Sequence, residues 1–265
     1  NENNIAATGA GYIYTGDVTG TGALTAVSLP ANGNATGGIV VLHPYLFYYG
    51  TAGFIGWSVA GKPDDLTGSG SGQARVAGQK IVKGLPLRAG AGSAPAGLFW
   101  AYDALIRSTY TGGATVFQFD TISAETTVLS QNSIIEYDGI YYWCGVDRFL
   151  MFNGVVREVP NNMNINFFYD NLNPNGKQKV FATKVPRFGE IWWCFPMGSS
   201  TECNHAIVYN VRENTWYDTP LPNSGRSAAS FSPAFAAPLM TGVVTSGSGY
   251  KVWQHEYGVN EIDGI

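Results

Sequence analysis

The stretch that decides the fold is SIIEYDGIYYWCGVDRFLMFNGVVREV, residues 133–159. Two dipeptides in it, Asp138-Gly139 and Asn153-Gly154, each separate two runs of β-branched and aromatic residues. Asp-Gly and Asn-Gly favour tight turns with positive φ, and between such runs they are the strongest short-range signals of a β-hairpin. The stretch therefore predicts four consecutive strands, at residues 133–137, 140–144, 148–152 and 155–159.

The next stretch of the chain has the same organisation. Turn residues at 187–189 and 212–214 lie between apolar runs, as expected where one antiparallel strand follows another. Because no window of 12 residues shows convincing helical periodicity, we expect strands throughout. The strands predicted here are 179–185, 190–195, 205–210 and 215–218.

The composition also indicates an all-β protein. Of 265 residues, 45% are hydrophobic, enough for a sizeable core, while 13% are charged, about half the roughly 25% that is usual for soluble domains. The 34 Gly and 13 Pro interrupt helices at short intervals, and the 14% aromatic content favours strands.

One short pattern, a Gly followed three or four residues later by a Trp, recurs five times. The first three Trp are each 43 residues apart and the later intervals are 50 and 60, against about 40–50 residues for a propeller blade. The Gly would supply the turn, and the Trp would pack between neighbouring blades. The alternative is a chance coincidence among seven Trp and 34 Gly. The residues of this structural repeat are Gly53, Trp57, Gly97, Trp100, Gly139, Trp143, Gly189, Trp193, Gly249 and Trp253.

These patterns predict an all-β fold, a β-propeller of four-stranded antiparallel blades with about five blades visible. Residues 1–37, rich in Gly and Thr, would form an N-terminal arm or edge strands. The start at Asn1 and the end just after an Asp-Gly pair suggest a segment of a longer protein. The propeller domain would span 38–263, with blades at roughly 38–84, 85–126, 127–176, 177–224 and 225–263.

Charge and hydropathy exclude several classes of protein. The net charge of −4 and the pI of about 5.3, without a basic stripe, argue against sequence-specific nucleic-acid binding. The longest apolar stretch, Ile39–Tyr49, is interrupted by His43 and Pro44 and is shorter than the ~20 residues that span a bilayer. The three cysteines, at irregular spacing, predict core thiols rather than disulfides or a metal site. They are Cys144, Cys194 and Cys203.

The residue types that carry catalysis are scattered along the chain. The acids Asp138, Asp147, Glu190 and Glu202 sit beside turns, where short acids are expected for turn hydrogen bonding. The three histidines are His43, His205 and His255, and they show no metal-ligand spacing.

Two local motifs resemble functional ones but are incomplete. Ser58, in Gly-Trp-Ser-Val-Ala, lacks the second Gly and the helix of a nucleophile elbow. The run 171–176 has the spacing of a calcium loop, with Ala182 in place of the final acid. We therefore predict no catalytic residue, no cofactor and no metal.

Several segments resemble those of bacteriophage tail-nozzle and packaged-DNA stabilisation proteins. The resemblance covers roughly residues 38–263, and some of the same pieces also suit kelch-like propellers. The segments that carry it are 129–149 with Phe152-Asn153-Gly154, Lys83–Arg88, Leu98–Trp100 and Asn210–Asp218.

The resemblance implies a non-enzymatic structural component of a phage short tail or head-to-tail connector, located in the virion. It implies a homo-hexameric ring that closes the DNA exit channel and touches other tail, portal or adaptor proteins. Non-specific contact with packaged DNA is compatible with this role, and a mildly acidic channel wall would prevent tight binding of the duplex. The alternatives are a receptor- or glycan-binding propeller at the tail tip, with exposed Trp or Tyr on one face, and a glycosidase with two facing acids.

Overall fold

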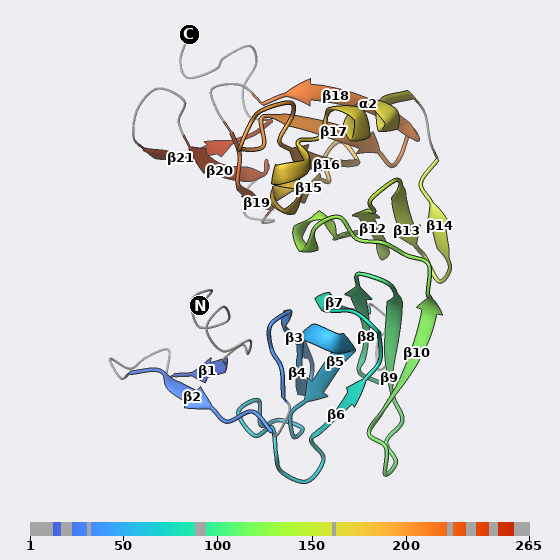
Figure 1. Cartoon of the computed structure of the whole chain (residues 1–265), viewed down its shortest axis with the longest axis vertical. Coiled ribbons are helices and arrows are strands. Elements are labelled where there is room, and N and C mark those ends of the chain that lie inside the picture. Colours follow the sequence, from blue (N-terminus) through green and yellow to red (C-terminus); the bar gives the residue numbers. More distant parts are fainter. Residues whose placement is uncertain are drawn as a thin grey trace. The chain divides into compact units, whose positions relative to one another are not determined.

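A computed structural model describes residues 13–16, 23–30, 33–87, 94–160, 163–221, 225–231, 237–243 and 249–256 (Figure 1). Most of the predicted arm at 1–37, and the end of the last predicted blade at 257–263, lie outside the described residues. The expected all-β class is confirmed, as are several four-stranded antiparallel sheets. The chain divides into two compact units, 1–127 and 128–265.

The first unit contains two four-stranded sheets and a small hairpin. One sheet has the order β3-β4-β5-β6 and the other β7-β8-β9-β10, so every strand pairs antiparallel with the next in the chain. The strands are β1 (Ile13–Thr15), β2 (Thr25–Val27), β3 (Gly38–Leu42), β4 (Tyr45–Tyr49), β5 (Phe54–Trp57), β6 (Gly72–Arg75), β7 (Ile81–Pro86), β8 (Ala96–Ala101), β9 (Leu105–Tyr110) and β10 (Phe117–Ser123).

The second unit repeats this arrangement. Its sheets have the orders β11-β12-β13-β14, β15-β16-β17-β18 and β19-β20-β21. The strands are β11 (Ile135–Tyr137), β12 (Ile140–Cys144), β13 (Phe149–Phe152), β14 (Val156–Glu158), β15 (Phe181–Val185), β16 (Glu190–Phe195), β17 (His205–Asn210), β18 (Thr215–Pro220), β19 (Ala228–Ser230), β20 (Leu239–Val243) and β21 (Tyr250–Gln254).

The eight strands predicted between residues 133 and 218 correspond to β11–β18, with ends that differ by two residues at most. Asp138 and Gly139 form the turn between β11 and β12 with φ of 51° and 78°. This left-handed backbone is what an Asp-Gly hairpin turn requires.

Three features differ from the sequence expectations. β7 crosses the boundary predicted at 84/85 and belongs wholly to the second sheet. The last sheet has three strands among the described residues rather than four. A helix, α2 (Met163–Asn171), joins the third and fourth sheets. It is nine residues long, too short to give a helical periodicity over 12 residues, and it buries Ile165 and Phe168.

Within each unit, consecutive sheets pack face to face. One cluster of buried residues joins the first two sheets, through Phe47 and Ile55 on one side and Phe99 and Ile106 on the other. The first strands of consecutive sheets lie next to each other, namely β3 with β7 in one unit and β11, β15 and β19 in the other. The sheets therefore meet along their first strands.

The fourth sheet is covered on both faces. Along β16, Ile191, Trp193 and Phe195 belong to the core shared with the third sheet, whereas Trp192 and Cys194 belong to the core shared with the fifth. Successive side chains of a strand point to opposite faces. All six residues of β16 are consequently buried. This is unusual for a strand that pairs antiparallel with both neighbours, because antiparallel sheets commonly leave one face exposed to water.

Trp193 contributes both a hydrogen bond and ring contacts to this packing. Its indole Nε1 donates to the Ser133 carbonyl oxygen at 2.9 Å, and its ring stacks on Trp216 with centroids 5.9 Å apart. We expect Trp193→Ala to lower the free energy of unfolding by about 3–5 kcal/mol, because it leaves a large cavity in the core. Chemical denaturation followed by tryptophan fluorescence and circular dichroism measures this.

The matched control is Tyr250→Ala, since Tyr250 is 85% exposed on β21. This change should alter the free energy of unfolding by no more than about 0.5 kcal/mol. A loss below about 1 kcal/mol for Trp193→Ala would contradict its place in the core.

Candidate functional site

The tryptophans of the sequence repeat lie in the cores of the sheets. Trp100, Trp143 and Trp193 are fully buried on the second strand of their sheets, while Trp57 is 7% exposed on a third strand. Trp253, on β21, is half-buried. The five copies therefore do not all occupy the same strand of a sheet.

The glycines of the repeat have two different roles. Gly53, Gly139 and Gly189 have φ between 64° and 78°, the backbone conformation of a turn that leads into the next strand. Gly97 instead lies inside β8, where a Cβ would come within 2.7 Å of Leu42. The repeat thus combines turn positions with one position of close packing.

Of the four acids considered from the sequence, Asp147, Glu190 and Glu202 bind neighbouring side chains. Glu136, not Asp138, caps the β11–β12 turn, with its Oε1 accepting from the Gly139 N–H at 2.8 Å. Asp147 forms an exposed ion pair with Arg148 at 2.6 Å, which holds the pKa of the Asp147 carboxyl below its usual range. Among the described residues, no group of three or more His, Cys, Asp or Glu could hold a metal ion.

The incomplete motifs have local structural roles. Ser58 is fully buried; its Oγ accepts from the Leu46 N–H and donates to the Val59 carbonyl. The calcium-like run 171–176 spans the end of α2 and the start of η3 (Pro174–Lys179), where Asn173 caps the 3-10 turn. The three cysteines are buried free thiols, as expected.

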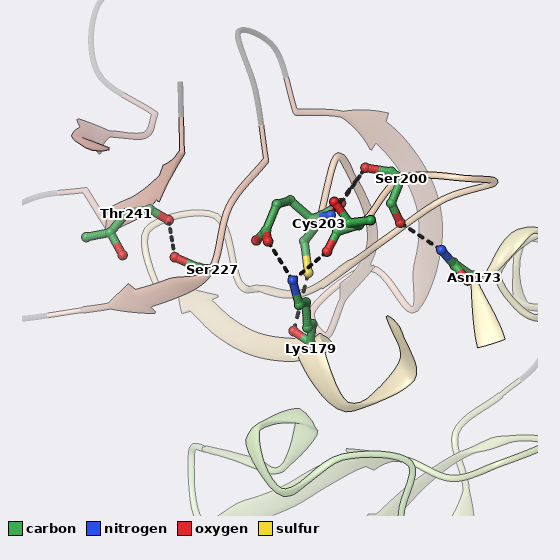
Figure 2. Close-up of polar contacts among 8 residues, drawn as sticks. Asn173, Lys179, Ser200, Cys203, Ser227 and Thr241 are labelled. Carbon is green, nitrogen blue, oxygen red and sulfur yellow. Dashed lines mark hydrogen bonds and ion pairs between the residues drawn. The ribbon is translucent and has the colours of Figure 1, made fainter. Parts of the chain in front are cut away.

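Lys179 fixes the loop 196–204 between β16 and β17 (Figure 2). Its Nζ donates to the Thr201 carbonyl at 2.6 Å and to Glu202 Oε1 at 2.5 Å, while the Cys203 thiol donates to the Lys179 carbonyl at 3.3 Å. Asn173 Nδ2 donates to the Ser200 carbonyl at 2.9 Å. Loop 196–204 is thereby tied to η3.

The same loop is hydrogen-bonded to a buried arginine, Arg226, which precedes β19 in the chain. The Arg226 backbone N–H donates to the Cys203 carbonyl at 2.7 Å, and the residue is only 2% exposed. Its Nε donates to His255 Nε2 at 3.0 Å, and its guanidinium lies 3.7 Å from the centre of the Trp253 ring. Arg226, which precedes the edge strand β19, is therefore linked to Trp253 and His255 at the other edge strand, β21, by a cation–π contact and a hydrogen bond.

A buried carboxylate lies on the facing sheet. Glu190, at the start of β16, is 8% exposed and accepts hydrogen bonds from Trp192 Nε1 at 3.0 Å and from the Tyr217 hydroxyl at 2.9 Å. Burial and Glu190 together raise the pKa of Tyr217, so this phenol keeps its proton as a donor. Partial burial, and the charge of Glu190, raise the pKa of Glu256. We call Glu190, Tyr217, Arg226, Trp253, His255 and Glu256 the polar junction.

His255 makes the polar junction sensitive to acid. Burial, with Arg226 beside it, lowers the pKa of His255 to about 4, so the ring is neutral at pH 7 and its Nε2 can accept from Arg226. Since the unfolded chain binds this proton near pH 6.5 and the folded chain only near 4, stability falls as the pH drops through this window. The loss should reach at most roughly 3 kcal/mol.

Comparison with His255→Gln isolates this contribution, because an amide oxygen can accept from Arg226 without titrating. Unfolding free energies of the two proteins should diverge as the pH falls from 7 to 4, with the wild type losing more. Glu256 acts in the opposite direction in both proteins, since its raised pKa favours the folded state in acid. A difference between the two proteins that stays constant over this range would contradict the role of His255.

An open groove of about 590 Å³ lies between the outer strands β6 and β10 of the first unit. Its lining residues are Ala74, Arg75, Val76, Ile106, Thr111, Thr115, Phe117, Gln118, Phe119 and Thr121. The volume lies within the ~300–1,000 Å³ of ligand sites. It is a candidate binding site of the first unit.

Neither the groove nor Arg226 was singled out from the sequence. The groove residues of β6 and β10 lie more than 40 residues apart in the sequence, and Arg226 lies in a stretch of Ser, Ala and Gly. In the sequence, Arg226 is an isolated arginine beside small residues, and this pattern is the same for a buried arginine as for one on the surface.

The comparisons with known proteins leave the chain without a family assignment. A scan against protein-family models finds no match, and neither does a search of curated proteins. Among the described residues, no helix has the length and apolar character needed to cross a membrane.

Proposed function

We propose that the chain is a non-enzymatic structural component of a bacteriophage short tail or head-to-tail connector, with its five sheets as blades of a β-propeller. The observation that carries the proposal is that each sheet follows the chain order and that first strands of consecutive sheets adjoin within each unit. A propeller places the first strand of every blade around a central axis, which brings these strands together.

The burial of the repeated tryptophans supports a packing role rather than a binding role. Four of the five are at most 7% exposed, so their rings are committed to the interior of the protein. The prominent titratable groups are likewise committed to internal partners, Glu190 to Trp192 and Tyr217, and His205 to Asp218 at 3.0 Å. This is the pattern of a structural protein.

In the assembled particle, the domain would form a homo-hexameric ring below the portal, in contact with other tail or adaptor proteins. The resemblance of residues 129–149 to tail-nozzle proteins supports this placement. Mass spectrometry of purified particles, followed by immunogold electron microscopy, tests it. We expect the chain in stoichiometric amount at the tail, and its absence from purified virions would end the proposal.

The low net charge leads to a separate expectation for DNA. With −4 charges and 15 Lys and Arg in 265 residues, the chain should not retard a duplex in gel-shift assays at physiological salt. A wall that neutralises few phosphates leaves the DNA free to move through a channel. Micromolar binding with a steep salt dependence would contradict this part of the proposal.

A second candidate function is binding of a receptor or glycan by the propeller at the tail tip. The specific observation that favours it is the groove between β6 and β10, which is lined by the half-buried Phe119 and by the exposed Thr111, Thr115 and Thr121.

A further inference from the structure

The β19–β21 sheet is attached to the fourth sheet, β15–β18, by few apolar side chains. Among the described residues, the buried cluster at this contact has nine members, of which Met240 alone comes from β19–β21, with the partly buried Ala229 packed against it. The cluster shared by the third and fourth sheets has fifteen members. Elements with few buried apolar contacts open at the lowest free energy, so β19–β21 is the sheet of this unit that separates most easily.

The polar junction supplies much of the remaining attachment. The His255 ring packs edge-on against Trp192 of β16, with centroids 6.2 Å apart. Arg226 contacts both His255 and Trp253, and its backbone N–H donates to the Cys203 carbonyl of loop 196–204. The hydrogen bond between Arg226 and His255 therefore joins the far edge of β19–β21 to a loop of the fourth sheet.

This hydrogen bond requires a neutral imidazole. His255 Nε2 can accept from Arg226 Nε at 3.0 Å only while its proton is on Nδ1. In the imidazolium both nitrogens are donors, so protonation removes the acceptor and places two positive charges at hydrogen-bond distance in a partly buried site. Burial, and the charge of Arg226, accordingly lower the pKa of His255 to about 4. Proton binding and the contact with Arg226 exclude one another.

The other charged and titratable groups around His255 do not reverse this effect. On β16, both Glu190 oxygens already accept hydrogen bonds, one of them from the Tyr217 phenol of β18, which is uncharged at pH 7 because its pKa is raised. Glu256 also has a raised pKa, so it loses its charge early as the pH falls. Lys251, exposed on β21, is a further cation. The pKa of His255 stays low because burial and Arg226 outweigh the two acids.

We propose that β19–β21 is an acid-releasable sheet: protonation of His255 breaks its contact with Arg226, and the sheet then separates from the fourth sheet while the third and fourth sheets stay packed together. The separation uncovers the apolar face of β16 that carries Trp192 and Cys194. Acid would thus expose a surface that is buried at pH 7, whichever particle or cell the chain belongs to.

The size of the effect follows from the two protonation equilibria of His255. In the released sheet the ring titrates near its ordinary pKa of 6.5, and in the attached sheet near 4. Between pH 7 and pH 5 this difference raises the equilibrium constant for opening about twentyfold. Glu256 acts in the opposite direction, so the contribution of His255 is measured against a variant that retains Glu256.

The three cysteines provide the measurement. Cys194 and Cys203 belong to the cluster that β19–β21 covers, whereas Cys144 belongs to the core between the third and fourth sheets. The reagent 4,4′-dithiodipyridine modifies thiols in mildly acidic solution, and mass spectrometry identifies the modified residue. Rates are divided by those of the unfolded chain at the same pH. In the wild type we expect modification of Cys194 and Cys203 to accelerate from pH 7 to pH 5 while Cys144 stays protected.

His255→Gln retains an acceptor for Arg226 but does not titrate. The ratio of the wild-type rate to the variant rate at Cys194 should therefore rise about twentyfold from pH 7 to pH 5. The matched control is His43→Gln, an exposed histidine of the first unit, which should follow the wild type at both pH values.

Amide hydrogen exchange of the wild type gives a second readout that does not depend on the folding of any variant. After correction for intrinsic rates, the amides of β20 and β21 should lose protection at pH 5, and those of β16 and β17 should keep it. Modification of all three cysteines together would indicate global unfolding and would overturn the proposal. A ratio of wild-type to His255→Gln rates that is the same at both pH values would also overturn it.

Discussion

The packing of twisted antiparallel sheets against one another along their first strands is the constraint on which the rest of this structure depends. A single four-stranded sheet with one exposed face would alternate apolar and polar residues. The middle strands here do not alternate: β4 and β16 are buried along their whole length. Such a strand is stable only if both faces are covered, so the sequence of β16 already requires a neighbouring sheet on either side.

This constraint explains where the predictions from sequence held. Asp138-Gly139 sets the register of β11 and β12 locally, through backbone conformations that few residue pairs adopt. The strand positions in the second unit could be predicted from such turn residues and from apolar runs such as 190–195, because the turn and the strands that it joins belong to one hairpin. Local information was sufficient for every strand from β11 to β18.

Features that depend on tertiary contacts could not be predicted in this way. Trp57 is spaced from Trp100 by the same 43 residues as Trp100 from Trp143, yet it lies on a third strand. In the first sheet, the second strand is filled by the aromatic run Tyr45–Tyr49, so equal spacing did not imply equivalent position. Arg226 was missed because its burial results from His255 and Trp253, almost 30 residues further along the chain.

The polar junction and the groove each lie between consecutive sheets of one unit. Where the β15–β18 and β19–β21 sheets meet, the buried charge of Arg226 is tolerated because a neutral His255 and the Trp253 ring contact it directly. Where β6 and β10 separate, nothing of comparable size fills the space, and polar side chains remain at its rim. The space between two sheets is thus filled by the charged side chain of Arg226 in the second unit, whereas the groove between β6 and β10 remains open in the first. The strands that form the groove are held by the core beneath it, so the residues that line the groove can change without disturbing the fold. Such grooves are therefore suitable places for a binding site to arise on a structural scaffold.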